Sequence, residues 1–298
     1  MEAREGKSRW YKEGGALLEE IDRSRPGFGA AHIWFMGQHG FVVSLGGMVF
    51  YIDVILNALP GEDGIERRVY PPPFKPEETG RADYVLCTHN HIDHLNLESL
   101  LPIAGANPRT RFIVPRPWRH ILTGAGIDGG RVLGAREGEE IRLGEAGFGE
   151  LSLIPVAAAH TLCNEGKPER DENGDCPSLG YVLKGNGLTV YHPGDTWAVP
   201  GLIASLKALG PLDIAFLPIN GSDWERSAAD IIGNMNALDA VKLAREAPVD
   251  LVIPSHYDMM ANNSENPALF AGYMYKLCPE KRFHISALGE RFIYAKNG

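Results

Sequence analysis

The stretch from His89 to His94, with the pattern H-x-H-x-D-H, constrains this chain most. It directly follows the apolar run 84–88, which is typical of a buried strand. Side chains alternate along an extended segment, so the first two histidines can point toward one metal ion, while the turn after them directs the aspartate and the last histidine toward a second. Solvated loop histidines are the alternative. Because so dense a cluster is costly without a ligand, the pattern favours a metal site.

Three further candidates, His160, Asp195 and His256, each stand just beyond an apolar run that is typical of a buried strand. Taken singly, each residue is explained equally well by a structural role. Because all three recur at the same kind of place, in a chain that already contains the dense motif, we predict them to be ligands as well. The predicted metal ligands are His89, His91, Asp93, His94, His160, Asp195 and His256.

Strands and helices alternate over the rest of the chain. Residues 32–53 predict antiparallel strands separated by glycine-containing turns, and Gly185-Asn186-Gly187 predicts a hairpin turn. The last segment, Phe283 to Tyr294, also predicts a hairpin. Strand-rich segments with interleaved helices in both halves indicate an α/β fold of two packed sheets with helices outside.

The first 30 residues are polar and predict an N-terminal arm or cap with a short helix near Leu17 to Ile21, followed by a single domain over residues 31–298. The chain start has no apolar signal region, and no later stretch approaches the roughly 20 apolar residues that span a bilayer. We therefore expect a cytoplasmic protein without membrane contact.

Composition narrows the class of protein. Apolar residues make up 44% and charged residues 22% of the chain, which is typical of a globular protein with a sizeable core. A net charge of -9 argues against nucleic-acid binding over the surface. The four cysteines lack CxxC spacing, so free thiols are favoured, with a Cys163–Cys176 pair as the alternative.

The order of the ligand motifs resembles that of the metallo-β-lactamase superfamily from about residue 30 to the end. The chain is most similar to the branch of the L-ascorbate-6-phosphate lactonases. This similarity is carried by WFMGQHGF (34–41), CTHNHIDHLN (87–96), YHPGDT (191–196) and IPSHYDMMAN (253–262). The resemblance implies an αββα sandwich of two mixed β-sheets flanked by helices. It also assigns His89, His91 and His160 to one metal and Asp93, His94 and His256 to a second, with Asp195 bridging.

This resemblance implies a metal-dependent hydrolase with two divalent ions. Histidine and carboxylate ligands suit Zn or Mn, with Fe as a further option. A metal-bridging hydroxide would open a small anionic ester or lactone, with Asp93 or Asp195 carrying the proton. Phosphodiester hydrolysis is the alternative reaction, and a protein that binds metal or ligand without turnover is the alternative of another class. The sequence does not determine the oligomeric state, and a homo-oligomer is possible.

Other residues are candidates for supporting roles. Asp53, Tyr257 and Asp258 are predicted to hold the ligands, although Asp53 also suits a strand-end turn. A substrate anion could be bound by Arg116, Arg119 and His120. A solvated helix face is the alternative explanation for these three residues. The remaining candidates are Trp197 and Trp224 as pocket-lining aromatics, and the loop from Cys163 to Ser178 as a substrate lid.

Overall fold

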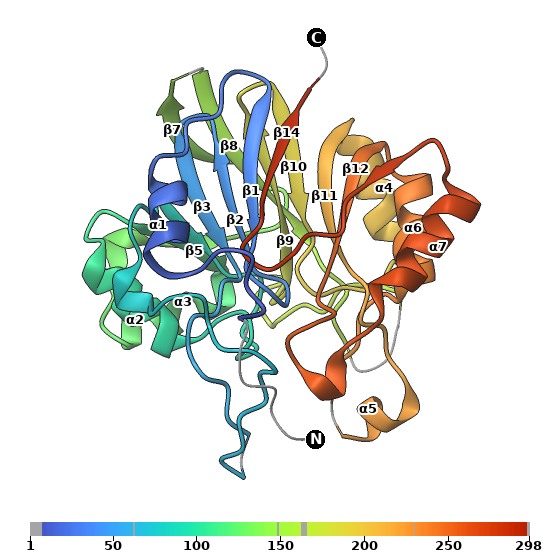
Figure 1. The fold of residues 1–298 in the computed structure, drawn as a ribbon, viewed down its shortest axis with the longest axis horizontal. Helices are drawn as coiled ribbons and strands as arrows, with labels where there is room; N and C mark the ends of the chain where they lie inside the picture. The colour runs from blue at the N-terminus through green and yellow to red at the C-terminus, as the bar shows by residue number, and fades with distance from the viewer. Residues whose placement is uncertain (1–7, 62, 148, 162–165, 230, 297–298) are drawn as a thin grey trace.

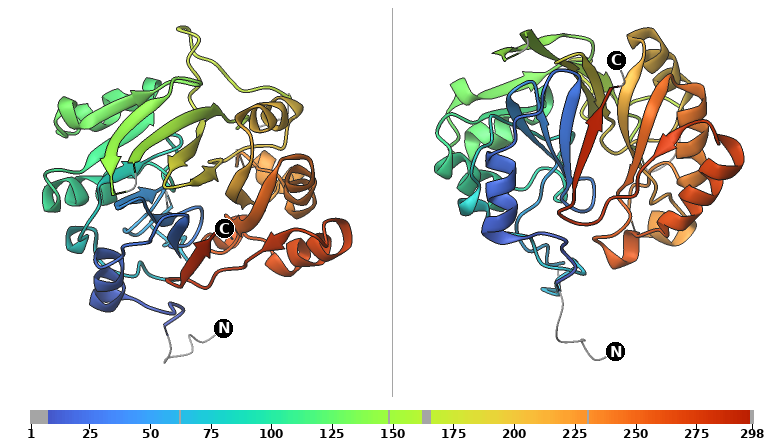
Figure 2. Two further views of the ribbon diagram at one scale, coloured as in Figure 1. Left: turned by 90° about the horizontal axis from the view of Figure 1, so that it is seen from above. Right: turned by 45° about the horizontal axis from the view of Figure 1, so that its top comes forward.

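The computed structural model describes residues 8–61, 63–147, 149–161, 166–229 and 231–296. Within these ranges, two sheets lie face to face and helices cover their outer sides (Figures 1 and 2). Each sheet has an antiparallel and a parallel part, so the predicted sandwich of two mixed sheets is confirmed.

The first sheet has the strand order β14-β1-β2-β3-β4-β5-β6. Its strands are β1 (Ala30–Phe35), β2 (Phe41–Leu45), β3 (Met48–Ile52), β4 (Tyr84–Leu86), β5 (Arg111–Pro115), β6 (Val132–Ala135) and β14 (Arg291–Ala295). Strand β1 pairs antiparallel with β14 and β2, whereas β3 to β6 run parallel. Parallel strands end at one edge, and β4 ends there just before His89.

The second sheet has the order β13-β12-β11-β10-β9-β8-β7. Its strands are β7 (Ile141–Ala146), β8 (Gly149–Ala157), β9 (Leu179–Gly185), β10 (Leu188–His192), β11 (Leu212–Pro218), β12 (Val249–Ser255) and β13 (Arg282–Phe283). The predicted hairpin of β9 and β10 is confirmed, with Asn186 and Gly187 at φ 54° and 74° in its turn. Strands β10 to β13 run parallel.

Helices cover both outer faces (Figure 1). They are α1 (Gly14–Asp22), α2 (Leu97–Ala106), α3 (Arg119–Gly124), α4 (Pro200–Leu209), α5 (Trp224–Ala228), α6 (Ala237–Glu246) and α7 (Pro267–Leu277). Short 3₁₀ turns occupy Pro76–Glu78, Arg116–Trp118, Gly129–Arg131 and Ala261–Asn263. Asparagine side chains accept backbone N–H bonds at the starts of α2, α6 and α7, which satisfies donors that a helix leaves free. None of the helices in the described ranges is long and apolar enough to cross a membrane.

The described part of the N-terminal segment caps the first sheet. Helix α1 places Leu17 and Ile21 at 0% exposure in a cluster with Trp34, and Glu20 accepts a hydrogen bond from the Trp34 indole at 2.9 Å. Trp10 donates to the carbonyl of Pro71 at 2.8 Å. Helix α1 and Trp10 of the predicted arm therefore pack against the rest of the chain, and the boundary after residue 30 stays a prediction.

The predicted hairpin from Phe283 to Tyr294 is wrong. Strand β13 pairs with β12 of the second sheet, whereas β14 pairs with β1 of the first. The residues between them cross from one sheet to the other, because each strand finds an edge with unpaired backbone groups. The residues between Phe283 and Tyr294 do not reveal from sequence that the two strands belong to different sheets.

The inner faces of the sheets meet through aromatic side chains. Phe41 of β2 and Phe216 of β11 stack with ring centroids 4.0 Å apart, and both are fully buried. Phe35 lies 5.2 Å from Phe41 in the same cluster. This contact joins the two sheets next to the edge where the predicted ligands lie.

Candidate metal centre

The seven predicted ligands come from loops that leave both sheets. His89, His91, Asp93 and His94 follow β4; His160 follows β8; Asp195 follows β10; His256 follows β12. Three groups have ligand atoms within 4.8 Å of one another: His89, His91 and His160; His89, His94 and Asp195; Asp93, His94 and His256. Strand ends from both halves of the chain thus place all seven residues in one cluster.

The first group consists of three imidazoles. His89 Nε2 lies 2.9 Å from His91 Nδ1, and His160 Nε2 lies 3.1 Å from the same atom. Burial lowers the pKa of His160 to about 4, and burial together with neighbouring imidazoles holds the pKa of His89 well below its usual range. Neutral imidazoles offer lone pairs, which is the state that a metal requires.

The second group combines a carboxylate with two imidazoles. Asp93 Oδ2 lies 3.6 Å from both His94 Nε2 and His256 Nε2. Asp195 lies between the two groups: its Oδ1 is 3.4 Å from His94 Nε2, and its Oδ2 is 3.2 Å from His256 Nε2 and 3.9 Å from His160 Nε2.

Charges in the cluster attract a cation. Burial opposes the charged form of His94, but the carboxylates of Asp195, Asp93 and Asp53 outweigh it and raise the pKa of His94 well above its usual range. Burial also opposes ionisation of Asp195, yet His256 and His94 hold the pKa of Asp195 well below its usual range. Positive charge is therefore stabilised at this point of the fold.

Unpartnered atoms test whether this cluster fits metal ions. His94 Nε2 and Asp195 Oδ1 are buried and have no hydrogen-bond partner among the described residues. Buried polar atoms without partners are costly, and here both belong to residues with metal-ligand chemistry. The donor set of imidazoles and carboxylates fits divalent metal ions, while their identity and number stay a prediction.

Asp53, a predicted supporting residue, contacts the cluster through His94. Its Oδ2 accepts from His94 Nδ1 at 2.8 Å, and its two oxygens accept from the backbone N–H and the hydroxyl of Thr88 at 2.9 and 2.7 Å. With Nδ1 directed to Asp53, Nε2 of His94 faces Asp93 and Asp195, where a divalent ion would take the place of the Nε2 proton. Asp53 takes φ 48°, a strained conformation for a non-glycine residue.

Among the described residues, no hydrogen bond, ion pair or ring contact joins the side chain of Tyr257 or Asp258 to a predicted ligand. Tyr257 stacks on Phe35 with centroids 5.9 Å apart. Asp258 accepts from the backbone N–H of Gln38 at 2.9 Å, and burial raises the pKa of this carboxyl. Asp258 thus connects to the cluster through Gln38, and its charge also interacts with that of His256.

Gln38 and His39 were not among the site residues predicted from sequence. Both are fully buried in the turn between β1 and β2, and both contact the loops that carry the ligands. The available signal was their place inside WFMGQHGF, a polar pair within an apolar strand turn.

Three of the predicted substrate contacts have other partners. Arg116 forms a 2.6 Å ion pair with the buried Asp175, and Arg119 donates to the carbonyls of Val132 and Gly129. The Trp197 indole donates to Thr161 at 3.2 Å, whereas Trp224 is 77% exposed at the start of α5. Their roles toward a substrate stay predictions.

The predicted lid is partly described. Cys163 lies outside the described residues, as do residues 162, 164 and 165. Of the cysteines that the structure describes, Cys87, Cys176 and Cys278 are free thiols. Asp175 holds the later part of the loop through Arg116 and Arg136.

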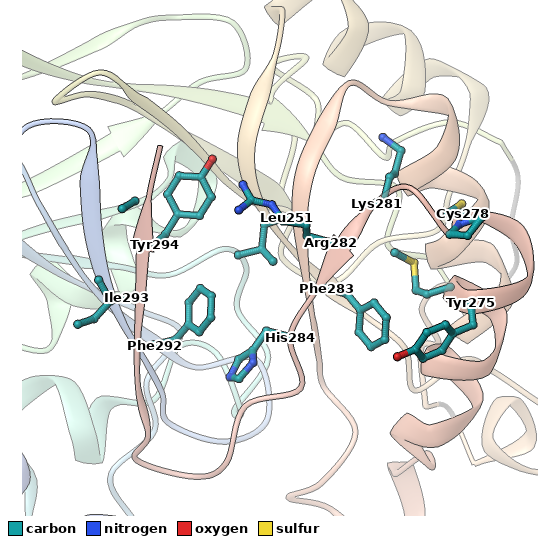
Figure 3. A pocket seen from close by; sticks show the side chains of 13 residues that line it. Leu251, Tyr275, Cys278, Lys281, Arg282, Phe283, His284, Phe292, Ile293 and Tyr294 are labelled. Atoms are coloured by element: carbon teal, nitrogen blue, oxygen red, sulfur yellow. The ribbon is translucent and has the colours of Figure 1, made fainter. Parts of the chain in front are cut away.

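A hollow of about 730 Å³ lies away from the cluster, between β14 and α7 (Figure 3). Phe283, Phe292 and Tyr275 line it, and no predicted ligand does. Its Lys281 donates to backbone carbonyls and its Arg282 pairs with Asp250. The hollow therefore adds no convergent free polar groups to the case for a catalytic site.

The comparison with known proteins agrees with this geometry. Residues 53–257 match the beta-lactamase superfamily domain, a span from Asp53 to just past His256. The chain belongs to the beta-lactamase superfamily. It is a metal-dependent hydrolase of that superfamily, as predicted from sequence.

Relatives of this superfamily member share most of its length. A UPF0173 metal-dependent hydrolase of Pelotomaculum thermopropionicum is 30% identical over 244 residues, which cover 80% of this chain and 89% of the relative. Another from Pyrococcus furiosus is 25% identical over 239 residues, covering 80% and 89%.

Solved structures share the fold. A metallo hydrolase from Ignicoccus hospitalis aligns with a TM-score of 0.65 at 18% identity, covering 90% of this chain and all of that one (100%). An isothiocyanate hydrolase from Delia radicum gut bacteria aligns with a TM-score of 0.67 at 18% identity, covering 89% and 99%.

Gly194 is a test of how tightly the Asp195 loop is packed. It takes φ 61°, and a Cβ there would lie 2.7 Å from the Cβ of Thr88. We expect Gly194→Ala to lower the free energy of unfolding by about 2 kcal/mol or more, through strain and overlap, as measured by urea denaturation.

Gly138→Ala is the matched control, because Gly138 also has a positive φ (74°), but a Cβ at this position would have no atom within 4 Å. We expect this variant to lose about 1 kcal/mol of the free energy of unfolding, from backbone strain alone. Equal losses in both variants would contradict close packing around Gly194.

Proposed function

We propose that this superfamily member hydrolyses a small anionic ester or lactone at a two-metal centre. His89, His91 and His160 would hold one ion, and Asp93, His94 and His256 the other, with Asp195 shared between them. The observation that carries this proposal is the place of Asp195, whose Oδ2 lies 3.9 Å from His160 Nε2 and 3.2 Å from His256 Nε2. One carboxylate within reach of both groups favours a binuclear centre over a single ion.

Zn or Mn suits these ligands, with Fe as a further option. When bound, two such ions polarise the scissile carbonyl and make water a better nucleophile at neutral pH. The ligand loops come from both sheets, so the chain itself fixes the geometry before a substrate arrives.

Proton transfer falls to the carboxylates. The side chain of Asp93 is 16% exposed, against 5% for Asp195, so Asp93 is better placed to reach a leaving oxygen. Gln38 donates to Asp93 Oδ2 at 2.8 Å, which leaves Oδ1 for the proton. Asp195 would stay ionised between the two metal positions.

The substrate class rests on the four sequence segments that resemble the lactonase branch. For the anion we propose Arg116, whose side chain is 45% exposed while Asp175 orients it. Asp175 lies four residues before Leu179, whose backbone N–H donates to the carbonyl of Thr88, the residue before His89.

A panel of hydrolysis assays tests the proposal. Purified protein is assayed on anionic and neutral lactones, an ester, a phosphodiester and a thioester, before and after chelation and after Zn or Mn is restored. We expect chelator-sensitive cleavage of the anionic lactone, with a lower KM than for the neutral one.

Other results would point elsewhere. Cleavage of the phosphodiester alone would show that the protein is a phosphodiesterase and not a lactonase. Two bound metals without turnover of any class would favour a metal- or ligand-binding protein.

A further inference from the structure

We infer that the turn between β1 and β2, through Gln38 and His39, positions Asp93 and His256, which would hold only the second metal, together with the shared Asp195. Within the described ranges, the turn makes no hydrogen bond to the three histidines that would hold only the first metal. This inference rests on the proposed two-metal centre. It concerns Asp93, His256 and Asp195, which come from different loops of the two sheets.

Gln38 contacts ligands from both sheets. Its side-chain Nε2 donates to Asp93 Oδ2 at 2.8 Å and lies 3.4 Å from His256 Nε2. Its backbone carbonyl accepts the N–H of His256, and its own N–H donates to Asp258 at 2.9 Å. A single fully buried residue thereby fixes one ligand through its side chain and another through its backbone.

The backbone at these contacts is strained. Gln38 and His256 take φ 55° and 57°, in the left-handed region that costs about 1–2 kcal/mol per non-glycine residue. Such strain persists where the surrounding contacts hold the conformation in place. The paired strain at Gln38 and His256 indicates that their mutual geometry is fixed.

His39 holds the residues just before two ligands. Its Nε2 lies 3.0 Å from the carbonyl of Gly194, and its Nδ1 lies 2.8 Å from Ser255 Oγ. A carbonyl can only accept, so Nε2 carries the proton and Nδ1 accepts from the Ser255 hydroxyl. A neutral His39 therefore ties together the backbone before Asp195 and the backbone before His256.

His192 completes the connection. Its Nε2 donates to the carbonyl of His39 at 2.8 Å, and its Nδ1 accepts from the N–H of Gly194 at 3.3 Å. The two rings lie 4.1 Å apart, and both are buried. Every nitrogen of His39 and His192 has one role, so the network is specified by its hydrogen bonds.

The first metal group lacks these contacts. In the described part of the chain, no hydrogen bond joins Gln38 or His39 to the side chains of His89, His91 or His160. Outer contacts of a ligand typically change metal affinity by about 10- to 100-fold. The loss should fall mainly on the second metal, because Asp93 and His256 would bind only that ion, whereas Asp195 would be shared.

The test compares metal binding by Gln38→Met with wild type. Methionine keeps the length and volume of the side chain but cannot donate to Asp93. We expect Zn titration to show an unchanged tight site and a second site weakened by about 10- to 100-fold. Elemental analysis after dialysis should then give about one metal per chain, against about two in wild type.

His39 supplies a second, independent variant pair. His39→Phe removes both hydrogen bonds and should also lose the second metal. His39→Gln keeps an N–H that can reach the carbonyl of Gly194, so we expect it to recover part of the second-site affinity. His284→Gln is the control, because His284 pairs with Glu290 at 3.2 Å and has no described contact with the cluster.

Each outcome has one meaning. Wild-type affinity at both sites in Gln38→Met and His39→Phe would overturn the inference, as would equal weakening of both sites in variants with a normal thermal midpoint. If Gln38→Met does not fold, the His39 pair decides. Wild-type protein with two metals but no lactone cleavage would reject the proposed substrate only, whereas a single wild-type metal site would reject the two-metal centre and this inference with it.

Discussion

Replacing Asp195 by Asn is expected to lower kcat/KM on the order of 10³-fold while the protein stays folded. The amide keeps the shape of the side chain but removes the negative charge that lies within 3.2 to 3.9 Å of His94, His160 and His256. Steady-state kinetics with the substrate that the assay panel identifies, combined with elemental analysis, measure the effect. Lost metal together with lost activity would place Asp195 among the ligands.

Asp213→Asn is the matched control. Asp213 is also a buried carboxylate of the second sheet, but it accepts from the backbone of Thr189 at 2.7 Å and pairs with Lys296. We expect this variant to lose some stability and to keep its kcat and its metal. If Asp195→Asn retained wild-type activity and both metals, the proposal that Asp195 is a shared metal ligand would be wrong.

Replacing Phe41 by Ala is expected to lower the free energy of unfolding by about 3–5 kcal/mol. Phe41 is fully buried, stacks on Phe216 of the other sheet at 4.0 Å and lies 5.2 Å from Phe35. The loss combines transfer of the ring, the cavity left behind and the broken aromatic pair. Urea denaturation followed by fluorescence gives the free energy.

Ile293→Ala is the control for this truncation. Ile293 lies on β14 and is 52% exposed, so its loss should cost less than about 1 kcal/mol. A loss of similar size in both variants would show that the contact between sheets at Phe41 is not a principal source of stability.

Much of the local structure was predictable from sequence. The apolar run before His89 is β4, and the runs before His160, Asp195 and His256 are β8, β10 and β12. These elements follow local rules, since strand runs and an Asn-Gly turn both act over a few residues. The structure brings the seven predicted ligands together because the strands that precede them end at one edge.

Contacts between distant segments were not predictable in the same way. The turn residues near Phe283 suggested a hairpin, but β13 and β14 pair with different sheets. Arg116 was a candidate for anion binding with a solvated helix face as the alternative, and its ion pair with Asp175, 59 residues along the chain, could not be predicted from either.

The sequence by itself determined which residues can bind metal and which strands carry them, because ligand chemistry and hydrophobic periodicity are properties of the local chain. Only the tertiary structure decided that Gln38, 55 residues before Asp93 and 218 before His256, touches both. It also decided that His39 joins the loops of Asp195 and His256. Such contacts depend on the packing of two sheets against each other, and a buried amide or imidazole gains its role only from the donors and acceptors that this packing places around it.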